Sequence, residues 1–68
     1  MKNVIPRNFN KIVAEMLRDT SCDKKGDIVC VLKNQYGYIE LNTRTGLYAS
    51  PFASTLRNGD FVKIIEII

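Results

Sequence analysis

The chain has 68 residues, of which 46% are hydrophobic and 25% charged, and its ten Lys and Arg against seven Asp and Glu give a net charge of +3. This length allows one domain, predicted over residues 1–68, and the apolar content excludes an intrinsically disordered chain. The charge excess is smaller than that of a typical dedicated DNA-binding domain, although it permits an anionic partner.

The first predicted element is an amphipathic helix over residues 8–19. Five apolar side chains recur at the i, i+3, i+4, i+7 and i+8 spacing of one helical face: Phe9, Ile12, Val13, Met16 and Leu17. Asn8 is a suitable N-cap, because its side-chain oxygen can accept a hydrogen bond from an otherwise unpaired backbone N–H. The polar residues 19–26 are expected to end this helix.

After this helix the pattern changes to short β-rich runs separated by turns. Strands are predicted over residues 28–32, 36–41, 47–50 and 61–68, with turns at residues 33–35, 42–46, 53–56 and 58–60. Gly46 is expected at positive φ, and residues 4–5 are a candidate for a short fifth strand. The predicted fold class is α+β and mostly β: the helix packs on a four- to five-stranded antiparallel barrel formed by residues 27–68.

Residues 26–56 resemble the Src-homology-3 family. Residues 26–29 (Gly-Asp-Ile-Val) open a strand in the manner of that family, and Tyr38 stands where an aromatic residue follows the hairpin. Residues 46–52 (Gly-Leu-Tyr-Ala-Ser-Pro-Phe) resemble its Gly-Leu-aromatic-Pro-Ser segment. The resemblance implies a Src-homology-3-like barrel, with an OB-like barrel as the alternative. A groove for proline-rich peptides is not implied, because the charges near these aromatics are basic.

The chain lacks the residues that most catalytic sites require. It contains no histidine, so Ser–His and Cys–His nucleophile arrangements cannot form. Its two cysteines, Cys22 and Cys30, lack Cys-x-x-Cys spacing and cannot fill a tetrahedral zinc site by themselves. We expect Cys22 to be an exposed thiol and Cys30 to pack as a small apolar residue. The sequence therefore predicts a protein that is not an enzyme and has no catalytic residue, metal or cofactor.

The carboxylates are expected to be solvated or to cap turns rather than to perform acid–base chemistry. Those in the loop and strand region all lie beside turn residues or on predicted exposed faces: Asp23, Asp27, Glu40, Asp60 and Glu66.

A mixed aromatic and basic surface is the candidate binding site. Tyrosines on predicted strands and turns alternate with cationic residues along the sequence, and the predicted partner-binding residues are Lys33, Tyr36, Tyr38, Arg44, Tyr48 and Arg57. On a small barrel, such rings can stack on bases while cations contact phosphates. In the alternative interpretation, one or two of the tyrosines belong to the core and the rest are ordinary strand residues.

Two functions remain open at this point. The first is a small protein-interaction module, for example a phage or mobile-element regulator that docks on host transcription or nucleic-acid machinery. The second is direct binding of single-stranded nucleic acid. The apolar residues 64–68 are expected either to be covered by the helix or to form a homodimer through the C-terminal strand. No apolar stretch approaches the ~20 residues that span a bilayer, so we expect a cytoplasmic protein with no membrane association.

Overall fold

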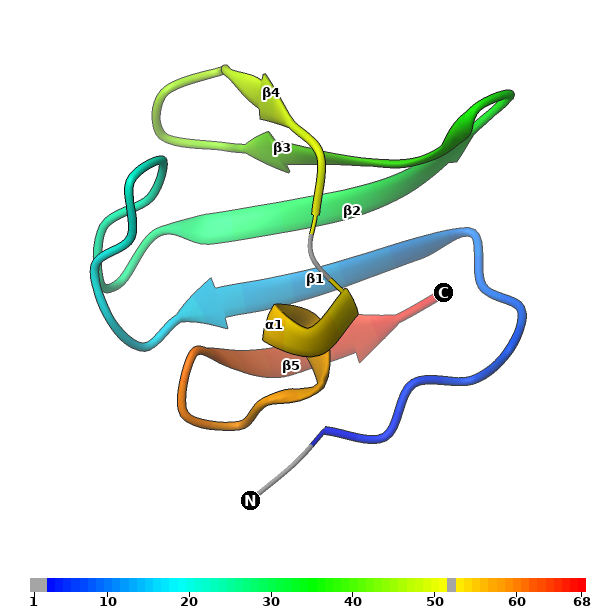
Figure 1. Ribbon diagram of the computed structural model, residues 1–68, viewed down its shortest axis with the longest axis horizontal. Helices are drawn as coiled ribbons and strands as arrows, with labels where there is room; N and C mark the ends of the chain where they lie inside the picture. The colour runs from blue at the N-terminus through cyan, green and yellow to red at the C-terminus, as the bar shows by residue number, and fades with distance from the viewer. Residues whose placement is uncertain (1–2, 52) are drawn as a thin grey trace.

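The computed structural model describes residues 3–51 and 53–68 (Figure 1). Its elements in chain order are β1 (Lys11–Met16), β2 (Ile28–Asn34), β3 (Gly37–Asn42), β4 (Tyr48–Ala49), α1 (Ala53–Arg57) and β5 (Val62–Ile67). The five strands form one sheet in the order β4-β3-β2-β1-β5, and every neighbouring pair is antiparallel. This open sheet is compatible with a small barrel-like fold.

The predicted N-terminal helix is wrong, because β1 occupies the middle of residues 8–19. Along β1, buried and partly exposed side chains alternate with a period of two, and the buried ones are Ile12, Ala14 and Met16. An isolated 12-residue helix is marginally stable in water. As a strand, the same segment gains backbone hydrogen bonds from both neighbours, since β1 lies between β2 and β5 in the sheet. Tertiary pairing therefore outweighs the helical spacing of the apolar residues.

The predicted strands are confirmed, with small shifts at their ends, as β2, β3, β4 and β5. Residues 4–5 are not a strand, and the missing fifth strand lies within the segment that was predicted to be helical. A tight or 3₁₀ turn is predicted over residues 53–56, and the short helix α1 takes its place. Gly46 has a φ of 73°, which confirms the positive φ expected in the turn before β4.

The hydrophobic core lies on one face of the sheet, here called the front face, which carries Ile12, Ala14 and Met16. The core also includes Val29 and Val31 from β2, Val62 from β5 and Leu56 from α1. Helix α1 lies over this face (Figure 1). Ile5 and Phe9, in the irregular arm before β1, pack against the same core. The opposite face of the sheet is called the rear face.

Candidate functional site

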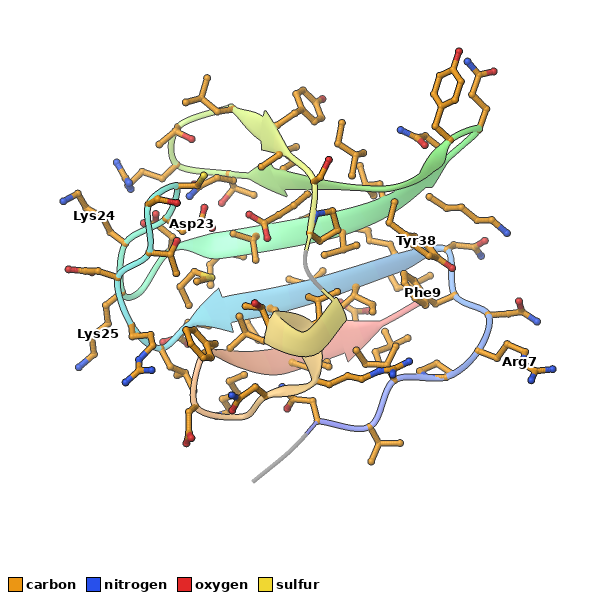
Figure 2. The ribbon with its side chains drawn as sticks, in the orientation of Figure 1. Arg7, Phe9, Asp23, Lys24, Lys25 and Tyr38 are labelled. Carbon is orange, nitrogen blue, oxygen red and sulfur yellow. The ribbon has the colours of Figure 1, made fainter. Side chains whose placement is uncertain are left out.

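One end of the sheet combines aromatic and basic side chains from two segments that are far apart in the sequence. The arm before β1 contributes Phe9, and the β2–β3 hairpin contributes Tyr38. Their rings are stacked, with 4.8 Å between centroids and 16° between planes (Figure 2). Because Phe9 is also packed against the front-face core, the stack joins the arm firmly to the hairpin. We call this region the aromatic-basic end and define it by its six side chains: Arg7, Phe9, Lys11, Lys33, Tyr36 and Tyr38.

The hairpin geometry presents Tyr36 and Tyr38 outward. Lys33 pairs with Tyr38 and Asn34 with Gly37, so residues 35–36 form the turn. Gly37 has a φ of 130°, a backbone conformation that costs glycine little. The Asn34 side-chain oxygen accepts a hydrogen bond of 2.8 Å from the Tyr36 backbone N–H, which fixes the turn. Tyr36 is consequently 89% exposed at the hairpin tip, and Tyr38 is 41% exposed.

Two segments that meet at this end contain positively charged residues and no negatively charged ones. Residues 5–12 and 32–39 contain Arg7, Lys11 and Lys33 and no Asp or Glu, leaving seven Lys and Arg against seven Asp and Glu elsewhere. Lys11 is the register partner of Leu32, next to Lys33 on β2, so the two cations lie at the same end of the sheet but on opposite faces. Within the described residues, none of the three forms an ion pair. Arg7 and Lys33 are therefore cations without an ion-pair partner among the described residues, in the same two segments as the exposed rings.

The six predicted partner-binding residues do not form one surface. Lys33, Tyr36 and Tyr38 meet at the aromatic-basic end, as described. Tyr48 is the register partner of Leu41, three residues after Tyr38 on β3, so Tyr48 and Tyr38 lie on opposite faces. The other two predicted residues lie elsewhere, Arg57 at the end of α1 and Arg44 in the turn after β3.

Sequence reasoning missed Arg7, Phe9 and Lys11 as site residues. The predicted helix over residues 8–19 includes Phe9 and Lys11 and does not place them beside the hairpin, whereas β1 begins at Lys11 and pairs with β2. The absence of acidic residues from both segments was visible in the sequence. That absence indicates a basic surface only together with the β1–β2 pairing, which places the two segments side by side.

The opposite end of the sheet holds a buried polar cluster (Figure 2, around Asp23). The Asn42 amide donates hydrogen bonds to Asp23 Oδ1 at 2.6 Å and to Asp27 Oδ2 at 2.8 Å. Arg44 forms a bidentate ion pair with Asp27, donating from Nε at 2.7 Å and from Nη2 at 3.0 Å. The backbone N–H of Lys24 donates to the same carboxylate at 2.9 Å. Arg44 therefore stabilises a loop within the protein.

Burial of these carboxylates differs from the prediction. Asp23 and Asp27 were expected to be solvated or to cap turns; each is only 6% exposed, and Asp27 does accept a hydrogen bond from the backbone N–H of Lys24 in the preceding turn. Hydrogen bonds from Arg44, Asn42 and the Lys24 backbone hold the pKa of Asp27 well below its usual range. The same ion pair raises the pKa of Arg44. The carboxylate of Asp27 therefore remains ionised and bound at neutral pH.

A largely apolar cavity of about 250 Å³ adjoins this polar cluster, and its lining includes Cys22, Ala49, Pro51, Leu56 and Phe61. Glu40 and Asp23 also line it. Burial, together with a hydrogen bond and charge repulsion from Asp23, raises the pKa of Glu40 to about 7. At neutral pH, Glu40 is therefore divided between its protonated and ionised forms. Both thiols are free, Cys22 exposed and Cys30 partly buried, as expected.

Comparison of the chain with protein-family models, with curated proteins and with solved structures found no match. In the part of the chain that the structure describes, no helix is long and apolar enough to cross a membrane. Nor does any group of three or more His, Cys, Asp or Glu side chains there have an arrangement suited to a metal ion. The function is therefore inferred from the chemistry and geometry of the side chains.

Proposed function

We propose that this protein is a non-enzymatic binding module that binds single-stranded nucleic acid through its aromatic-basic end. One observation carries the proposal: the two segments that hold a stacked and an exposed aromatic ring also contain Arg7 and Lys33, and neither segment contains an Asp or Glu. Binding of single strands without strong sequence preference combines aromatic platforms for bases with cations that follow the backbone. The aromatic-basic end offers both.

Each side chain has a defined role in this proposal. Tyr36 offers an exposed ring at the hairpin tip for stacking with a base. Tyr38 has one ring face against Phe9, and its 41% exposure leaves surface for a second base. Arg7 and Lys33 contact phosphates on either side of the stacked rings, because they flank Phe9 and Tyr38 in the two segments.

Known magnitudes set the expected affinity and its salt dependence. Stacking contributes about 1–3 kcal/mol per base, so two rings favour binding without making it tight. The two phosphate contacts of Arg7 and Lys33 give a slope of about −1.4 for the logarithm of the affinity against the logarithm of the salt concentration. A tenfold rise in salt should therefore weaken binding about 25-fold. We expect dissociation constants in the micromolar range or weaker at physiological salt.

Fluorescence anisotropy with a labelled ten-nucleotide oligothymidine in about 50 mM salt tests this proposal. The double substitution Arg7→Gln and Lys33→Gln should weaken binding about tenfold and reduce the salt slope, because two phosphate contacts are lost. The matched control is Lys24→Gln with Lys25→Gln, which removes two exposed cations from the opposite end (Figure 2). Absence of binding at this salt, or equal weakening by both double variants, would contradict the proposal.

A protein-interaction module remains the second candidate function, favoured by the apolar cavity beside β4. We also propose that the barrel is Src-homology-3-like, because β2, β3 and β4 coincide with the residues 26–56 that carry the resemblance. Residue 52, the last residue of the segment 46–52 that resembles the family, lies outside the described residues. If the double variant Arg7→Gln and Lys33→Gln binds oligothymidine as the unsubstituted protein does, the protein-interaction reading is preferred.

A further inference from the structure

The rear face of the sheet carries an apolar patch on the three strands β2, β3 and β4. Antiparallel register places its members on this face, and the patch consists of Ile28, Cys30, Leu32, Ile39, Leu41 and Tyr48. Cys30 pairs with Leu41, which pairs with Tyr48, so one continuous row crosses the patch. On the other side of Cys30, the same row continues to Val13 of β1.

The two faces of β2 differ in how they are covered. On the front face, Val29 and Val31 are 0% exposed, because α1 and the N-terminal arm pack over the sheet. Every member of the rear patch retains exposed surface, and Tyr48 is 61% exposed. Antiparallel sheets that face water on one side normally alternate apolar and polar residues. Strand β2 instead has apolar side chains on both faces, which indicates that a further layer covers the rear face.

We infer that the rear face binds a second copy of this chain, with the two sheets packed face to face in a two-fold dimer. Sheets pack about 10 Å apart in such an arrangement. The Cα extents of the whole chain, 27 × 27 Å, limit the rear face to at most roughly 700 Å², slightly below the ~800 Å² that each partner buries in a standard interface. A chain of this length also has a small core, so a second core between copies is a common source of added stability.

The charges on the rear face favour a second copy over a strongly charged partner. The rear face carries four charged residues, all on β1 and β5: Lys11, Glu15, Lys63 and Glu66. Two are positive and two negative, so this face has no net charge. In a two-fold interface, each residue meets the same surface of the other copy, and equal numbers of both signs allow each Glu to approach a Lys. A nucleic acid would find no net positive potential on this face.

The position of Cys30 provides a direct probe of the arrangement. Cys30 lies in the middle of the row that runs from Val13 through Leu41 to Tyr48. A two-fold axis through the centre of the patch brings the two Cys30 thiols within reach of a short bismaleimide. Cys22 is on the exposed loop after β1 and does not belong to the rear face.

Sedimentation velocity of the full chain, from about 10 µM to 1 mM, tests the inference. We expect a species of twice the 7.7 kDa chain mass at the upper concentrations. Leu41→Lys should raise the dimer dissociation constant about 100-fold, because symmetry places the buried charge in the interface twice. Tyr48→Lys should act in the same direction at a more exposed position, where folding is not affected. The control Tyr36→Lys, at the aromatic-basic end, should leave the dimer unchanged.

Crosslinking with the short bismaleimide gives an independent readout. Cys22→Ser should still yield a linked dimer through Cys30, whereas Cys30→Ser should not.

A chain that stays monomeric at 1 mM overturns the inference. So does a dimer that survives both Leu41→Lys and Tyr48→Lys. A dimer that dissociates on Ile65→Pro but not on Leu41→Lys would place the interface on the free edge of β5. That arrangement is the predicted homodimer through the C-terminal strand, and finding it would also overturn the inference. Oligothymidine binding by a monomeric variant keeps this result separate from the proposed function.

Discussion

The two ends of the sheet both carry charged residues, but they use them differently. In the buried cluster around Asp27, both buried carboxylates and the Asn42 amide have partners inside the protein, and Arg44 completes the cluster. At the aromatic-basic end, Arg7 and Lys33 form no ion pair within the described residues. The comparison shows that exposure of a charged residue is a poor guide to its role. Arg44 is half-exposed yet structural, because its guanidinium reaches a buried carboxylate.

The aromatic residues differ in the same way: some stabilise the fold, and others are exposed and free to bind a partner. Phe9 gives one ring face to Tyr38 and packs against the core, so it is a support for the site. Tyr36 makes no comparable contact and projects from a turn that Asn34 fixes. A rigid support beside an exposed ring reduces the entropy that binding a flexible strand costs. The three predictions that follow test this division between the two ends.

The largest expected effect is on stability, at the buried polar cluster. Asn42→Ala removes the two hydrogen bonds that the side-chain amide donates to Asp23 and Asp27. It also removes the two hydrogen bonds that the side-chain oxygen accepts from backbone N–H groups. Asp23 then stays buried without its hydrogen bond from Asn42. We expect a loss of about 3 kcal/mol in the free energy of unfolding, because buried carboxylates become poorly satisfied. For a domain of this size, that corresponds to a fall in Tm of roughly 15 °C, measured by circular dichroism.

Asn34→Ala is the matched control at the other end. Its side chain makes one exposed hydrogen bond in the turn, so we expect a loss of about 0.5 kcal/mol. Similar losses in the free energy of unfolding for the two variants would show that the cluster around Asp27 does not stabilise the fold more than the hairpin turn does.

The next effect is on binding. Tyr36→Ala should weaken oligothymidine binding about tenfold, because one stacking platform is lost, while leaving Tm nearly unchanged. Tyr48→Ala removes the same ring from another exposed position, on the rear face, and should not weaken binding. Anisotropy titrations of both variants check this pair. Equal effects would mean that the nucleic acid does not distinguish the two ring positions.

The smallest effect is a pH dependence of stability that originates at Glu40. Its pKa of about 7 in the folded protein exceeds the ordinary value of 4.5, so the folded state binds the proton more tightly. Stability should therefore fall as pH rises from about 4.5 to 7 and then level off. The chain has no histidine whose titration would obscure this window. Urea unfolding at several pH values should show the slope, and Glu40→Gln should remove it.

A slope that persists in Glu40→Gln would contradict this origin. Asp27 acts in the opposite direction, because its pKa is lowered in the folded state. Its contribution is present above the ordinary value of 3.8 and is lost on further acidification, outside the window that tests Glu40.

The β-rich half of the fold was predictable from the sequence, and the N-terminal half was not. Alternation and turn residues located β2 to β5, because Gly37 and Gly46 occupy backbone conformations that favour glycine. In β1, the apolar residues satisfy helical and strand spacing alike, and Ala14 gives no preference for a strand. Only pairing with β2 and β5 decides between them, and that pairing is a long-range property.

The candidate site was predictable in part for the same reason. The hairpin residues Lys33, Tyr36 and Tyr38 lie close in sequence, so they were found together. Arg7 and Phe9 join them through the sheet, which local patterns do not reveal. The burial of Asp23 and Asp27 is not evident from the sequence, because the loop before β2 is polar. The amide that hydrogen-bonds both carboxylates belongs to Asn42, which is 15 residues after Asp27.

Chemical-shift mapping by NMR tests the proposed function most directly. Titration of ¹⁵N-labelled protein with ten-nucleotide oligothymidine at low salt should shift the amide resonances of residues 7–11 and 33–38. Residues 20–27 and 42–46, at the opposite end, should remain unperturbed and serve as the internal reference. Shifts concentrated at the opposite end, or no shifts at millimolar oligonucleotide, would contradict the assignment of the aromatic-basic end as the binding site.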